Sequence, residues 1–124
     1  MNKVTISGNL GKDPELKFTQ NGQSTVKMTV ATSRKVKDEW VSTWHNVTAW
    51  GSLAENAASS LQKGDRVTIS GRYDCREWED KSGNKRTSYE IVADDIAASM
   101  KNASVEITRI KTESAGSNGP EEDF

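Results

Sequence analysis

The chain has 124 residues, a single cysteine and a formal net charge of −1. This length allows one domain and little more, and a hydrophobic content of 33% is low for a monomer of this size, which favours an oligomer. Cys75 has no partner for an internal disulfide, no apolar run approaches the length of a membrane span, and the N-terminus lacks the apolar core of a signal peptide. We therefore expect a soluble cytoplasmic protein that does not bind membranes.

Strand-type alternation dominates the N-terminal half. In chain order, the predicted elements are a strand over 4–8, a turn at Asp13-Pro14, a strand over 16–19, a hairpin turn at Asn21-Gly22 and a strand over 26–31. The charged segment 33–41 is predicted to be a flexible loop that contains Trp40.

The C-terminal half adds a helix and further strands. The predicted elements are a strand over 42–50, a helix over 53–61 capped by Ser52 and ended by Gly64, a long strand over 67–78, a turn over 79–84, a strand over 85–93 and a candidate extra strand over 105–110. About five strands with one helix between the third and fourth predict an all-β barrel of the OB type, which binds oligonucleotides across one face. Residues 1–112 are the expected domain, and 113–124 the expected Gly/Ser linker and disordered acidic tail.

Three tryptophans fall on the polar face of these strands. Because strand side chains alternate faces, Trp44 and Trp50 lie opposite the aliphatic face of their strand, and Trp78 shares a face with Arg72 and Arg76. Flat aromatic rings beside cations on a sheet surface suit single-stranded nucleic acid. The alternative is burial in the core or a subunit interface, because tryptophan is usually mostly buried and a bulge reverses the alternation. The joint arrangement favours ligand contact.

The opposite faces are predicted to form the core. They carry Val67, Ile69, Gly71, Tyr73 and Cys75, followed on the next strand by Tyr89, Ile91 and Ala93. Cys75 is then a buried thiol and no nucleophile. His45 lies on the inward face of its strand and is expected to be a hydrogen-bonded core or interface residue.

Charge is divided unevenly along the chain. Residues 1–112 carry 17 basic against 14 acidic side chains, a net +3, while 113–124 carry four acids and no base. We expect the phosphates of a nucleic acid to be contacted by Arg34, Lys35, Lys37, Lys63, Arg72, Arg76, Lys85 and Arg86. With one histidine, one cysteine and no phosphate-binding loop, the sequence predicts a binding module without metal or cofactor, and no enzyme.

Several fragments, in this order and spacing, carry a family resemblance. They include VTISGNLGKDPE over 4–15, ATS over 31–33, Trp44-His45 with Trp50-Gly51, KGD over 63–65 and ISGR over 69–72. The chain closely resembles bacterial and phage single-stranded DNA-binding proteins over roughly residues 2–97. The resemblance implies an OB fold, four copies per assembly and sequence-independent wrapping of single-stranded DNA. It places Trp44, Trp50 and Trp78 at base-stacking positions and Lys63 near the binding path.

The chain also departs from that family. Val36 stands near the family's loop aromatic and Trp40 follows later, so Trp40 is a further stacking candidate, while Glu77 stands where a basic residue is common. The segment 99–111 loosely resembles a strand that hooks neighbouring subunits together in some actinobacterial members.

The C-terminal tip keeps the family's acids and final phenylalanine without its Ile-Pro. We expect Glu121, Glu122, Asp123 and Phe124 to dock replication and repair proteins, the alternative being a solubilising tail. Two other functions stay open for the whole chain, an RNA-binding or cold-shock-like module and a structural OB subunit that only bridges replication or repair proteins. The expected location is the nucleoid, or the host cytoplasm if a phage encodes the chain.

Overall fold

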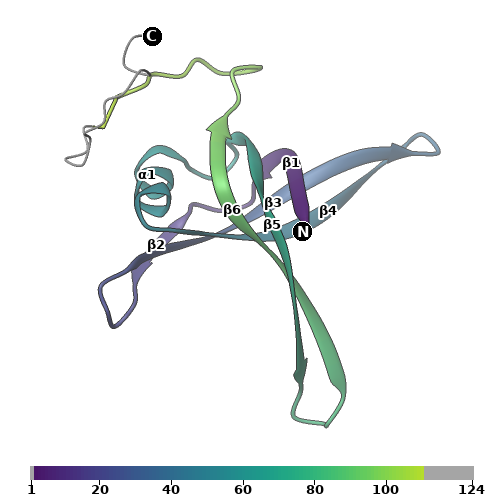
Figure 1. The fold of residues 1–124 in the computed structure, drawn as a ribbon. Helices are drawn as coiled ribbons and strands as arrows, with labels where there is room; N and C mark the ends of the chain where they lie inside the picture. The colour runs from purple at the N-terminus through teal and green to yellow at the C-terminus, as the bar shows by residue number, and fades with distance from the viewer. Residues whose placement is uncertain (1, 111–124) are drawn as a thin grey trace.

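The computed structural model describes residues 2–110 and shows a strand-rich barrel with two projecting hairpins (Figure 1). Its elements are β1 (Lys3–Leu10), β2 (Glu15–Phe18), β3 (Ser24–Val36), β4 (Glu39–Trp50), α1 (Ser52–Ser60), β5 (Arg66–Glu79) and β6 (Lys85–Ala98). The six strands form one sheet in the order β1-β5-β6-β4-β3-β2, and a β1–β3 pairing closes five of them into a ring. Among the strands within residues 2–110, only β4 and β6 pair in parallel. This closed five-stranded barrel, with α1 between its third and fourth strands, is the predicted OB fold.

The core follows the predicted alternation inside the barrel. Fully buried side chains come from every second residue of the barrel strands, among them Val26, Met28, Val30, Val47, Ile69 and Ile91. Ala54 and Ala57 of α1 join the same cluster. The outward residues of β3 and β4 are therefore fixed by the burial of their neighbours.

Two glycines allow the barrel strands to approach closely. A Cβ on Gly8 would lie 2.2 Å from the carbonyl oxygen of Ala31, where β1 meets β3, and a Cβ on Gly71 would lie 2.2 Å from that of Val92. Gly71 follows an irregularity in the β5–β6 register, between Ser70 and Gly71. Such bulges with glycine are a common way to bend strands into a small barrel.

The predicted flexible loop over 33–41 is wrong, because this segment is a regular hairpin. The β3–β4 pairing continues to Val36 and Glu39, so the turn holds only two residues, Lys37 and Asp38. Their φ angles are 51° and 69°. Two left-handed residues match the twist of the flanking strands, but Lys-Asp lacks the glycine by which such turns are recognised in a sequence.

The predicted burial of Tyr73, Cys75 and Tyr89 is also wrong. Beyond Gly71, β5 and its partner β6 leave the barrel as a two-stranded arm (Figure 1). All three side chains are exposed there. Both faces of such an arm meet solvent, so alternation no longer separates inside from outside. The two tyrosine rings stack on each other, with centroids 5.5 Å apart.

Two local predictions about α1 and the C-terminal segment also fail. The residue before α1 is Gly51, with φ of 67° and no side-chain cap, and Ser52 is already helical, because the chain must reverse sharply out of β4. Residues 104–110 join no strand: although Val105 and Ile107 alternate with polar residues, no described strand pairs with them, and Ile107 stays 87% exposed. Over residues 2–110, no helix has the length and apolarity to cross a membrane.

Candidate nucleic-acid interface

Trp44 and Trp50 lie on one outer surface formed by β3 and β4. The register pairs Trp44 with Ala31 and Trp50 with Thr25, so these side chains point to the same side of the sheet. The tryptophans are 62% and 42% exposed, respectively. The predicted outward placement is confirmed, and neither ring is buried in the core of this chain.

Trp44 rests on a glycine in the connection between β1 and β2. A Cβ on Gly11 would lie 2.5 Å from the Cζ3 atom of the Trp44 ring, so only a glycine leaves room for the ring. The Gly11 N–H donates to the carbonyl oxygen of Thr29 at 2.9 Å, which fixes this connection to β3. The ring is thus supported by backbone on one side and open to solvent on the other.

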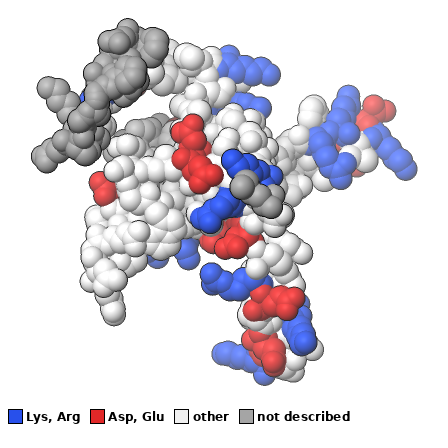
Figure 2. All heavy atoms as spheres, viewed as in Figure 1, with Lys and Arg blue, Asp and Glu red and all other residues white. Residues whose placement is uncertain are grey.

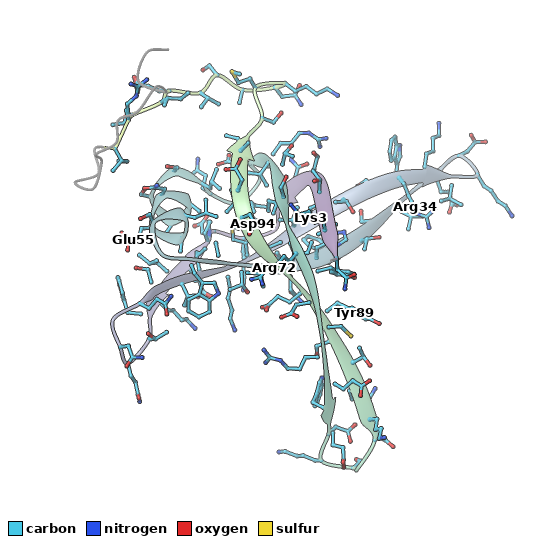
Figure 3. All side chains as sticks on the ribbon, viewed as in Figure 1. Lys3, Arg34, Glu55, Arg72, Tyr89 and Asp94 are labelled. Carbon is cyan, nitrogen blue, oxygen red and sulfur yellow. The ribbon has the colours of Figure 1, made fainter. Side chains whose placement is uncertain are left out.

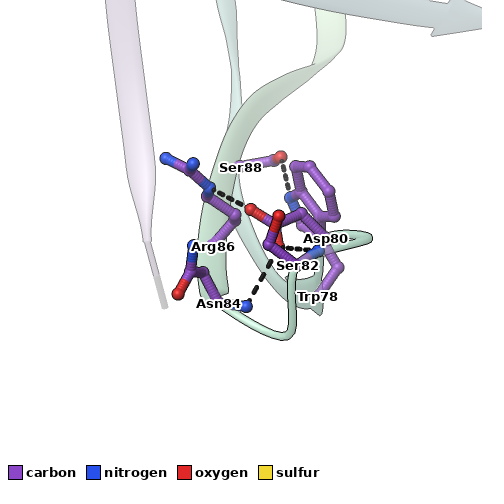
Figure 4. A network of polar contacts seen from close by, with 6 residues as sticks. All are labelled: Trp78, Asp80, Ser82, Asn84, Arg86 and Ser88. Carbon is purple, nitrogen blue, oxygen red and sulfur yellow. Dashed lines mark hydrogen bonds and ion pairs between the residues drawn. The ribbon is translucent and has the colours of Figure 1, made fainter.

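Trp78 stands on the β5–β6 arm and is held by a hydrogen bond. Its indole N–H donates to the Ser88 hydroxyl oxygen at 2.7 Å (Figure 4). The ring is 48% exposed. Since the bond fixes the ring edge, the ring presents a surface of defined orientation for stacking.

The tip of the same arm is organised by Asp80. Its carboxylate accepts the backbone N–H groups of Asn84 and Ser82 and lies 2.9 Å from the Arg86 Nε (Figure 4). The Asn84 backbone bond, followed by the bond from Arg86, holds the pKa of Asp80 below its ordinary value of 3.8. Arg86 is therefore already paired with an acid, although it stands opposite Trp78 in the register.

A groove of about 530 Å³ joins the arm to the outer surface of β3 and β4. Its walls include Trp78 and Arg76 from the arm, Asn46 and Thr48 from β4, and two lysines, Lys12 and Lys27. Two acids, Asp74 and Glu90, also line it, and the Thr48 hydroxyl donates to Glu90. The groove thus offers two aromatic residues, Trp78 and Tyr89, and three cations against two carboxylates.

Sequence reasoning missed three lysines of this surface. Lys12 and Lys27 line the groove, and Lys17 pairs with Thr25, which pairs in turn with Trp50. Lys27 alternates with the buried Val26 and Met28, so its outward position could have been found from the strand pattern. Lys12 lies in a connection, where no periodicity identifies a face.

The predicted cations divide into separate groups. Figure 2 shows mostly blue side chains, with some red, at the tip of the β3–β4 hairpin, where Arg34, Lys35 and Lys37 lie. It shows mixed red and blue along the β5–β6 arm, where Arg76, Lys85 and Arg86 lie. Figure 3 shows Arg34 far along its hairpin from Arg72, which pairs with Val92 and sits opposite Lys3. Lys63 is exposed beyond α1, where its backbone N–H donates to Asp13.

Of the predicted residues, the structure brings Arg76 and Trp78 together at the groove, beside the surface of Trp44 and Trp50. Trp40 is 71% exposed and pairs with Lys35 near the hairpin tip. The four tail residues Glu121, Glu122, Asp123 and Phe124 lie outside the described residues. Over residues 2–110, no three His, Cys, Asp or Glu side chains are grouped as a metal site would require.

Comparison with known proteins identifies the family of this chain. The sequence model of the single-strand binding protein family matches residues 1–99. This chain belongs to that family. The matched region ends just beyond β6, so it contains the whole barrel and both hairpins.

Named relatives span several bacteria. Single-stranded DNA-binding protein 2 of Streptomyces coelicolor is 37% identical over 91% of this chain and 60% of its own length. The single-stranded DNA-binding protein of Paenarthrobacter aurescens is 36% identical over 94% of this chain and 74% of its own. Single-stranded DNA-binding protein 1 of Chlorobaculum tepidum is 43% identical over 77% of this chain and 63% of its own length. The match thus spans about 60–74% of the length of these relatives.

Proposed function

We propose that this chain binds single-stranded DNA without sequence preference and protects it during replication, recombination and repair. The observation that carries the proposal is the set of three exposed tryptophans, Trp44, Trp50 and Trp78, beside a groove lined by Arg76 and two lysines. Membership of the single-strand binding protein family and the names of the relatives support it.

The binding mechanism requires stacking and charge, and no catalysis or cofactor. Each base can stack on an exposed indole at about 1–3 kcal/mol, and each Lys or Arg at a phosphate releases condensed counterions. A duplex keeps its bases stacked inside, so it cannot use the tryptophans. Because Asp74 and Glu90 line the groove, we expect stacking to contribute more than charge.

We further propose that the chain forms a homotetramer. In the part of the chain that the structure describes, Lys3–Gly8 of β1 pairs with β5 on one side only, since the pairing of β1 with β3 is confined to Asn9 and Leu10. An unpaired strand edge is a template for another chain. Val4 and Ile6 are only half-buried, and the Tyr73–Tyr89 pair beyond them is exposed. Sedimentation at micromolar concentration tests this: a tetramer is expected, and a monomer alone would refute it.

His45 belongs to the same proposal. Its Nε2 lies 3.0 Å from the Thr32 hydroxyl, and the ring is half-buried on the inward face of β4. We therefore propose His45 as a hydrogen-bonded residue at the margin of the subunit interface.

The tail is proposed to dock replication and repair proteins. Residues 1–112 form the proposed binding domain, and Glu121–Phe124 offer an aromatic ring beside three acidic side chains, which a small apolar pocket rimmed by Arg or Lys can read. Deletion of Phe124 should abolish capture of partners from a host lysate and leave oligo-dT affinity unchanged or slightly higher. Identical partners with and without Phe124 would favour the solubilising alternative.

The rival functions separate in one anisotropy experiment with labelled oligo-dT, oligo-rU and duplex DNA. Our proposal expects the order oligo-dT above oligo-rU, with the duplex weakest. An RNA-binding module would prefer oligo-rU, and a structural subunit would bind none of the three. We place the protein at the nucleoid in the cytoplasm, where single-stranded DNA arises.

A further inference from the structure

A second groove lies at the base of the β3–β4 hairpin, away from the arm. Its volume is about 310 Å³, and its walls include Trp40, Ser33, Asn9, Arg66, Lys101 and Asn102. This volume is at the lower end of the range for ligand pockets, about 300–1,000 Å³. The groove is therefore suited to one small unit of a ligand and too small for a long segment.

Hydrogen bonds through Ser99 hold the backbone of the two cationic residues of this groove, Arg66 and Lys101, in neighbouring positions. The Ser99 N–H donates to the carbonyl oxygen of Arg66 at 2.9 Å, and the Lys101 N–H donates to the Ser99 hydroxyl at 3.2 Å. The turn after β6 is thereby fixed beside the start of β5. Asn9 is fixed as well, because its side-chain amide donates to the carbonyl oxygen of Gly64 at 3.1 Å.

The charge of this groove is of one sign. No acid is among its lining residues, and within residues 2–110 neither Arg66 nor Lys101 forms a salt bridge. The first groove, in contrast, sets three cations against two acids. Two cations without acids attract an anion, and a phosphate between them would replace solvent on both.

The aromatic wall of the groove completes a nucleotide-like set of contacts. Trp40 is the most exposed of the four tryptophans at 71%, yet it borders a hollow. Its ring can stack on a base, while the amides of Asn9 and Asn102 and the hydroxyl of Ser33 can bond to base edges or sugar.

We propose that this groove binds one nucleotide of single-stranded DNA, with its base on Trp40 and its phosphate between Arg66 and Lys101. The inference rests on the proposed function and extends the DNA path beyond Trp44. Ala31 carries the continuity, because it lines this groove and pairs with Trp44 in the register. Trp40 and Trp44 share a face of β4, separated by about 13 Å at roughly 3.3 Å per residue.

The test compares Trp40→Ala, Trp40→Phe and the double variant Arg66→Ala/Lys101→Ala with the parent. The affinity of each protein is measured for oligo-dT of about 16 and of about 5 nucleotides. These lengths are close to the upper and lower ends of the site size of one OB fold. As a charge-matched control, Lys81→Ala/Arg109→Ala removes two cations that line neither groove. Denaturation of every variant is followed in parallel.

On the longer oligonucleotide, Trp40→Ala should lose roughly 5- to 150-fold in affinity, and Trp40→Phe should lose less. The double variant should show a shallower slope of log affinity against log salt, by about 0.7 for each phosphate that is no longer neutralised. The control should keep the parental slope. The short oligonucleotide can bind at the other tryptophans without entering the second groove, so it should lose less affinity in each variant than the longer one.

The outcomes separate this inference from the proposed function. If the parent fails to bind oligo-dT, the proposed function itself is wrong. If the parent binds and the double variant keeps its salt slope on the longer oligonucleotide, the second groove is no part of the path. If Trp40→Ala unfolds, the salt slope of the double variant and the affinity of Trp40→Phe still test the second groove, because both variants keep an aromatic ring at position 40.

Discussion

Replacing Trp44 with alanine should weaken DNA binding while leaving the barrel folded. The covered part of the ring is a little over a third, since 62% is exposed. A tryptophan buries up to about 250 Å², so the substitution removes roughly 90 Å² of buried surface, which at about 25 cal/mol per Å² costs about 2 kcal/mol of unfolding free energy. A domain with a typical stability of about 5–15 kcal/mol tolerates this cost. Binding should fall by about 1–3 kcal/mol.

A companion variant perturbs the same ring without removing it. The alanine Cβ in Gly11→Ala would meet Trp44 at 2.5 Å, whereas ordinary contact begins near 3.4 Å, so the ring must retreat by about 0.9 Å. We expect Gly11→Ala to weaken oligo-dT binding by part of the Trp44→Ala effect, and Trp44→Phe to retain most of the affinity.

The assay is equilibrium binding of labelled oligo-dT, with urea denaturation measured on each variant. If Trp44 stacks on bases, affinity should fall in Trp44→Ala and Gly11→Ala under conditions where both remain folded. Parental affinity in both variants would show that Trp44 does not contact DNA, whatever happens to their stability.

Three further predictions concern the arginines of the β5–β6 arm, the close approach of the strands at Gly71 and the titration of Asp80. Arg76→Ala should reduce the salt slope by about 0.7, and Arg86→Ala by less because Arg86 is already paired with Asp80; equal reductions would contradict this ranking. Gly71→Ala should prevent cooperative thermal unfolding, because its Cβ would lie 2.2 Å from the Val92 carbonyl oxygen, and an unchanged melting curve would contradict the close approach. The pKa of Asp80, measured by NMR, should lie below 3.8. Because folding lowers this pKa, the stability that Asp80 adds to the hairpin is present above pH 3.8 and is lost as the pH falls through the pKa of the folded state. A titration midpoint of Asp80 at or above pH 3.8 would contradict the hydrogen bonds from Asn84 and Arg86 to its carboxylate.

The sequence could predict the barrel and its outer face because alternation has a physical cause there. Val26, Met28 and Val30 are buried in the barrel, so the residues between them must face outward, and the same parity places Trp44 and Trp50. Family resemblance added the closed topology, which no local pattern contains.

The same reasoning failed where the strands leave the barrel. Tyr73 and Cys75 continue the inward parity of Ile69, but the arm has solvent on both faces, and where a strand leaves its barrel is set by long-range pairing. The turn at Lys37-Asp38 also escaped prediction, because lysine rarely adopts a left-handed backbone. The groove lysine Lys12 was missed since only the tertiary structure brings its connection to Trp78.

Quenching of intrinsic tryptophan fluorescence by oligo-dT tests the central claim most directly, because the four tryptophans are both the reporters and the proposed contacts. The account predicts strong, saturable quenching by oligo-dT, reduced in Trp44→Ala, Trp50→Ala and Trp78→Ala, and little change with duplex DNA of equal charge. Quenching of equal depth by duplex, or none by oligo-dT at low salt, would contradict base stacking on this surface.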